Sequence, residues 1–119
     1  MSVNVTESST FTTTSDTADN QIVASTVTRP RLVAFYADTT NLATTATAVF
    51  RIKTKIDGTN YRAVPTANGT VDHTWTRATD AKGVCLILFG VDVAVQVTIQ
   101  LATGEAVSLP YRLVEVMLD

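Results

Sequence analysis

Few side chains in this chain of 119 residues have the chemistry and spacing of a catalytic site. It has one histidine, His73, which directly follows Asp72, and one cysteine, Cys85. Consecutive strand residues point to opposite faces, so Asp72 would not orient the His73 ring as a general base requires. No serine or cysteine lies in a nucleophile motif. We therefore predict that the protein is not an enzyme.

The sequence offers little to a metal ion or cofactor. One histidine and one cysteine do not supply enough soft ligands for zinc. Asp16, Asp19 and Asn20 are rich in oxygen but lack the spacing of a calcium loop, so we interpret them as turn-forming side chains. Cys85 has no second cysteine to pair with and falls in the most apolar segment, which predicts a buried thiol. We expect no cofactor and no metal.

The most concentrated charge is a basic stripe, which we define as Arg51, Lys53, Lys55 and, on the same face across the next turn, Arg62. It could dock on an acidic partner, or it could be a solvated face whose lysines discourage edge-to-edge aggregation. The formal net charge is −2 and no aromatic residues interleave with the stripe, so we do not expect a nucleic-acid partner.

The elements that must position these residues are strands. Threonine and valine, both β-branched, are the commonest residues, and no segment has a sustained helical period. We predict an all-β fold, an antiparallel β-sandwich or jelly-roll-like barrel of about 8–10 short strands. Residues 1–20 would form an amino-terminal arm or edge strand, and residues 21–119 a single domain.

Alternation of apolar and polar residues predicts strands over residues 21–27, 31–37, 46–56, 60–64 and 71–78. Residues 38–45 form a polar loop that is long enough to cross between sheets. Asp57-Gly58 predicts a hairpin, in which Tyr61 and Ala63 share the inward face with Ile56.

Residues 84–111 predict a three-stranded antiparallel meander. Gly90 suits a two-residue hairpin turn, and Gly104 suits a bulged turn in the left-handed conformation. Residues 84–89 are apolar on both faces, which places that strand inside a sheet rather than at its edge. The apolar phase changes after Leu113, so we expect a bulge or a passage between sheets at residues 110–113.

The amino terminus lacks the basic start and apolar run of a signal peptide, and no stretch approaches the roughly 20 apolar residues needed to cross a bilayer. We therefore expect synthesis in the cytoplasm and no membrane partner.

Three features together resemble small β-rich structural proteins of tailed-bacteriophage virions. They are the Thr/Ser/Ala-rich amino terminus, the hairpin FRIKTKIDGTNYR at residues 50–62 and the Val-rich carboxy-terminal region. The resemblance implies a non-enzymatic protein of the virion that binds other virion proteins or copies of itself, as capsid decoration or cement or as a tail component, usually as a homo-oligomer.

We therefore predict a virion structural protein that acts through protein–protein contacts. The candidate contact residues are Arg51, Lys53, Lys55, Arg62 and Phe11. The alternative is a ligand-binding β-sandwich, most plausibly for carbohydrate, in which Trp75 and Tyr61 would stack on sugar rings; aromatic residues in a small sandwich are more often part of the core.

Overall fold

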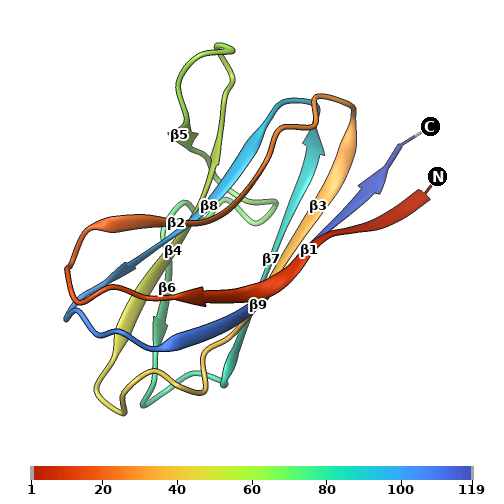
Figure 1. Ribbon diagram of the computed structural model, residues 1–119. Helices are drawn as coiled ribbons and strands as arrows, with labels where there is room; N and C mark the ends of the chain where they lie inside the picture. Colours follow the sequence, from red (N-terminus) through yellow and green to blue (C-terminus); the bar gives the residue numbers. More distant parts are fainter. Residues whose placement is uncertain (1, 119) are drawn as a thin grey trace.

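The computed structural model describes residues 2–118, which form nine β-strands and no helix. Sheet A has the strand order β1-β9-β3-β7, and sheet B has the order β2-β8-β4-β5, with β6 also paired to β4. The two antiparallel sheets pack together as a sandwich, which confirms the predicted fold class (Figure 1). The strands are β1 (Ser2–Thr12), β2 (Asp19–Ser25), β3 (Arg31–Asp38), β4 (Thr47–Thr54), β5 (Arg62–Ala63), β6 (His73–Thr76), β7 (Gly83–Val91), β8 (Val95–Leu101) and β9 (Ser108–Met117).

The pairing is nested. Strand β1 pairs with β9, β2 with β8, β3 with β7 and β4 with β6, all antiparallel. The first half of the chain thus pairs with the second half like one long hairpin, and this hairpin is folded over so that its strands alternate between the two sheets. This is the strand arrangement of a double-sheet jelly roll.

The core lies between the sheets and follows the alternation that the sequence shows. In β4 the inward residues Ala48, Phe50 and Ile52 are buried, and in β8 the inward residues from Val95 to Leu101 are buried as well. The Phe35 ring lies 6.2 Å from the Phe50 ring, so the two sheets meet through aromatic side chains. The crossing of residues 38–45 from sheet A to sheet B is confirmed.

The hairpin at Asp57-Gly58 is present, but the faces of its strands differ from the prediction. Gly58 has a φ of 79°, and the Asp57 carboxylate accepts hydrogen bonds from the backbone N–H groups of Thr59 and Asn60. Ala63 lies opposite Lys53, and Arg62 lies opposite Thr54. Residues directly opposite each other share a face, so Arg62 is not on the face of the basic stripe and Ala63 is not on the inward face. Ile56 is 70% exposed, because β4 ends at Thr54.

The predicted meander over residues 84–111 is wrong, because β7 and β9 lie in sheet A while β8 lies in sheet B. Strand β7 pairs with β3 and is an edge strand rather than an interior one. Its outward side chains lie on the outer face of sheet A, which is open to solvent, and Cys85 is exposed rather than buried.

Glycine occurs at the two predicted turn positions, 90 and 104, for structural reasons other than a hairpin turn. Gly90, with φ of 61°, lies in a bulge where Phe89 and Gly90 of β7 face the single residue Leu32 of β3. A left-handed glycine is typical of such a bulge. Gly104 does not have a positive φ; a Cβ atom there would lie 2.2 Å from the backbone oxygen of Ser15, so close chain approach requires glycine.

Strand β9 runs through sheet A without changing sheet or phase, contrary to the prediction. Its inward positions are Leu109, Tyr111, Leu113, Glu115 and Met117, all buried. The apparent change of phase arises because a charged residue, Glu115, occupies an inward position. The bulge in this pair of strands lies in β1, between Val5 and Glu7.

Candidate interaction surfaces

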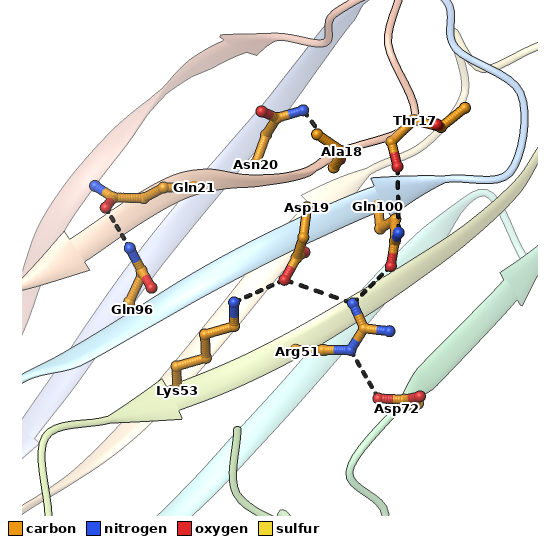
Figure 2. Close-up of polar contacts among 10 residues, drawn as sticks. All are labelled: Thr17, Ala18, Asp19, Asn20, Gln21, Arg51, Lys53, Asp72, Gln96 and Gln100. Carbon is orange, nitrogen blue, oxygen red and sulfur yellow. Dashed lines mark hydrogen bonds and ion pairs between the residues drawn. The ribbon is translucent and has the colours of Figure 1, made fainter. Parts of the chain in front are cut away.

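The outer face of sheet B is a polar surface in which the basic stripe is neutralised. Figure 2 shows Asp19 of β2 between Lys53 and Arg51 of β4. Lys53 Nζ lies 2.7 Å from Asp19 Oδ2, and Arg51 Nη1 lies 3.5 Å from the same oxygen. Arg51 Nε also pairs with Asp72 Oδ1 at 2.8 Å, so the two cations face two carboxylates.

The electrostatics of this cluster follow from that geometry. Burial opposes ionisation of Asp19, but the hydrogen bond and charge of Lys53, with the charge of Arg51, outweigh it and lower the pKa of the carboxyl. The hydrogen bond from Arg51 likewise lowers the pKa of Asp72. These ionised carboxylates leave little free positive charge for an acidic partner.

The remaining basic residues lie apart from that cluster. The Lys55 ammonium lies 4.8 Å above the centre of the Tyr61 ring, a cation–π contact, and Tyr61 is partly buried. Arg62 lies 3.8 Å from Asp57 and its side chain is 66% exposed. The four basic residues that the sequence groups together are therefore three separate local arrangements.

Of the three oxygen-rich residues, Asp16 and Asn20 make the expected turn contacts, whereas Asp19 lies in β2 and pairs with Lys53 and Arg51. Asp16 Oδ1 accepts hydrogen bonds from the Thr14 hydroxyl, the Ala18 backbone N–H and the Asn20 amide. The hydrogen bond from Thr14, followed by those from Asn20 and Ala18, lowers the pKa of Asp16. Among residues 2–118, no three His, Cys, Asp or Glu side chains converge in a way that could hold a metal ion.

The aromatic and histidine candidates lie in or near the core. Trp75 is 3% exposed and its indole N–H donates to the Ala81 carbonyl at 2.6 Å, so its ring offers no surface to a sugar. His73 lies opposite Phe50 on β4, and burial lowers the pKa of the imidazole. Asp72 is held by Arg51 rather than by His73.

Phe11 and the rest of β1 form the edge of sheet A beside β9. Phe11 lies opposite Leu109 and packs against the core. Glu7 lies opposite Leu113 and accepts a hydrogen bond from the Tyr111 hydroxyl at 2.6 Å. Burial first, then this hydrogen bond, raises the pKa of Tyr111 to about 12. This edge therefore carries both a bulge and a charged residue directed toward the inner side.

A buried ion pair on the inner side of sheet A, which Ser25 links to sheet B, was missed by the sequence reasoning. Arg31 of β3 pairs through Nε with Glu115 of β9, and each residue is 0% exposed. The Ser25 hydroxyl of β2 donates to the same carboxylate at 3.0 Å, and Arg31 Nη2 donates to the Val93 carbonyl at 3.0 Å. The only sequence signal was a glutamate at a position where alternation calls for an apolar residue.

The outer face of sheet A differs sharply from that of sheet B because it is apolar. Leu32 lies opposite Val116, and Ala34 lies between Val114 and Ile87, so these two rows of the outer face are apolar. We define the apolar face as Leu32, Ala34, Tyr36, Ile87, Phe89, Val114 and Val116. Three of these side chains are well exposed: Tyr36 at 44%, Ile87 at 45% and Phe89 at 58%. The sequence signal was the apolar character of both faces in residues 31–37 and 84–89.

No protein-family model matches the chain, and neither a curated protein nor a solved structure shows significant similarity to it. The described residues contain no helix of the length and apolar character that a membrane span needs. The function is therefore inferred from the sequence and the surfaces of this chain.

Proposed function

We propose that this chain is a non-enzymatic structural protein that acts through protein–protein contacts, as capsid decoration or as a tail component of a bacteriophage virion. The observation that supports the proposal is the apolar face of sheet A. The virion setting comes from the resemblance of the sequence to small β-rich virion proteins.

The outer faces of the two sheets differ in how well water solvates them. On sheet B, Arg51, Lys53 and their acidic partners present charges to water, as an ordinary solvated face does. On sheet A, rows of apolar residues extend across β7, β3 and β9 with Arg112 as a charged neighbour of Tyr36. Contiguous apolar patches on a protein surface commonly mark interaction sites, because their exposure costs free energy until a partner covers them.

The jelly-roll pairing is consistent with the proposal but is not the evidence for it. Double-sheet jelly rolls occur in viral capsid domains, but also in lectins and cupins. One fold hosts unrelated functions, so the surface rather than the topology supports the assignment. The burial of Trp75 removes the strongest candidate for sugar stacking.

The test is the composition of virions purified from cells that produce the phage whose genome encodes the chain. The chain is produced as wild type, as Tyr36→Lys on the apolar face, or as Thr74→Lys on β6. Thr74 is an exposed residue of sheet B, so its variant is a matched control for the added lysine. Circular dichroism verifies that each variant folds.

We expect quantitative mass spectrometry to detect the wild type and Thr74→Lys in the particles, and Tyr36→Lys at roughly a tenth of that level or less, since burying a lysine costs about 1.4 kcal/mol or more. Particles that lack the wild-type chain would contradict the proposal. Equal incorporation of all three chains would show that the apolar face is not the contact.

A further inference from the structure

Sheet A has two edges, and only one of them is protected against pairing with another strand. Edge strands in soluble proteins usually carry charges, prolines, bulges or inward-directed charged residues that prevent such pairing. Strand β1 has the bulge at residues 5–7 and the charged residue Glu7. Strand β7 has no charged residue and no proline along its nine residues, and its bulge lies near its end, at residues 89–90.

The free edge of β7 is also accessible. A groove of about 290 Å³ runs beside it, lined by Thr66, Asn68 and His73 from sheet B and its loops and by Leu86, Ile87 and Phe89 from β7. The outward side chains of Ile87 and Phe89 are among the most exposed large apolar residues of the chain. Both the free backbone edge and the outward side chains of β7 therefore lack a cover in the single chain.

We propose that two copies of this chain pair through β7, antiparallel and about a two-fold axis at Ile87, so that the two copies of sheet A form one continuous sheet. This inference rests on the proposed function in one respect only: it takes the chain to act through protein–protein contacts, and it names one partner as a second copy.

The charges that flank β7 favour a second copy of the chain as the partner. They also favour the register centred on Ile87. Lys82 lies just before the strand and Asp92 lies just after it, both exposed and without an ion-pair partner among residues 2–118. Antiparallel self-pairing centred on Ile87 places Lys82 of each copy beside Asp92 of the other. A register centred on Cys85 would instead place Lys82 beside Leu88. The bulge at Gly90 displaces the strand end by about one residue, a shift that the long lysine side chain can span.

The side chains agree with the same pairing. Centred on Ile87, the pairing places Cys85 of one copy opposite Phe89 of the other, and both residues belong to the outward-facing set. Directly opposite residues share a face, so the two apolar faces lie on the same side of the joined sheet. The dimer closes the open edges of both β7 strands and leaves Tyr36 available to the virion partner. An isologous two-fold contact of this kind is also the commonest interface of homo-oligomers.

The first test is the solution mass of the full chain, measured by size-exclusion chromatography with light scattering over a range of concentrations. We expect a monomer–dimer equilibrium for the wild type and for the control Thr74→Lys. In Ile87→Lys, two lysines meet at the two-fold axis, and we expect the dissociation constant to rise roughly a hundredfold or more.

The second test uses charge reversal, which a change in folding alone would not mimic. Lys82→Asp and Asp92→Lys should each weaken the dimer, because each places like charges side by side. The double variant Lys82→Asp/Asp92→Lys should restore most of the wild-type affinity. If the double variant is as weak as either single variant, the proposed register is wrong.

The third test fixes the two-fold axis by cross-linking. In Ile87→Cys made in a Cys85→Ser background, the two introduced thiols should lie opposite each other at a separation that a disulfide can span. Mild oxidation should give a covalent dimer on a non-reducing gel, whereas Thr74→Cys in the same background should remain monomeric.

The outcomes separate this inference from the proposed function. A wild type that is monomeric at every concentration, or a dimer that Ile87→Lys leaves unchanged, overturns the β7 pairing. In either case, incorporation of the wild type and loss of Tyr36→Lys from virions would still support the proposed function. Conversely, a β7 dimer that is absent from virions would support the pairing and overturn the virion assignment.

Discussion

The molecule contains two clusters of opposite charges that share the same chemistry and differ in solvation. One joins Arg31 and Glu115 on the inner side of sheet A, where both side chains are almost completely buried. The other joins Arg51 and Lys53 to Asp19 on the outer face of sheet B, where the side chains are 20–23% exposed. Water solvates the outer cluster whether or not it is paired, but the inner pair has only its protein partners. The cost of losing a partner should therefore be much larger inside.

The largest expected effect comes from breaking the inner pair. Glu115→Gln keeps the shape of the side chain but leaves the Arg31 charge buried without its counter-charge. We expect the free energy of unfolding, measured by urea denaturation, to fall by about 3–5 kcal/mol. Asp72→Asn, the same acid-to-amide change at an exposed ion pair, is the matched control and should have a far smaller effect. Equal losses in the two variants would contradict the comparison.

Replacing both inner charges tests whether the pair itself stabilises the fold. The double variant Arg31→Met/Glu115→Leu removes the buried charges together, and such replacements are often neutral or stabilising. Here the Ser25 hydroxyl and the Val93 carbonyl lose a partner, which offsets part of the gain. We expect a stability within about 2 kcal/mol of the wild type, and clearly above that of Glu115→Gln. A double variant as unstable as Glu115→Gln would show that the pair makes a large net contribution.

The comparison also explains which parts of the molecule the sequence could predict. In β4 and β8 one face meets water, so polar and apolar residues alternate and the local pattern is sufficient to identify the inward residues. On the outer face, Arg51 and Lys53 could be recognised as neighbours because they share one strand. Their carboxylate partners could not, because Asp19 and Asp72 come from segments that only the fold brings beside β4.

The errors have a common physical cause, which is that pairing in a jelly roll is long-range. Gly90 and Gly104 look like turns between neighbours, but Val33 pairs with Leu88 and Leu32 with Val116, far apart in the chain. Local turn chemistry therefore favoured a meander that the real pairing excludes. Glu115 gave the impression of a change of phase for the same reason, since the Arg31 that makes its burial tolerable lies at the start of β3.

The outer cluster should show a smaller effect that depends on salt. Asp19→Asn removes the carboxylate that Lys53 and Arg51 share, and we expect a loss of about 1 kcal/mol at low ionic strength. Because this cluster is partly exposed, the loss should shrink as sodium chloride is raised toward 1 M, where the screening length falls to about 3 Å. The loss caused by Glu115→Gln should change little over the same range. Salt-independent effects at both sites would remove the distinction between the clusters.

The pH dependence of the outer cluster gives the smallest and most specific effect. The pKa of Asp19 is lowered in the folded state, so the carboxylate stabilises the fold at pH values above the ordinary pKa of 3.8. That contribution should be lost as the pH falls below 3.8 and through the folded-state pKa, because protonation then removes the charge that Lys53 and Arg51 hold. The difference in unfolding free energy between the wild type and Asp19→Asn should be constant from pH 7 to about pH 5 and should decline below pH 4. A difference that stays constant down to pH 2 would mean that the carboxylate charge at Asp19 does not stabilise the fold. The outer cluster would then only make the outer face of sheet B hydrophilic.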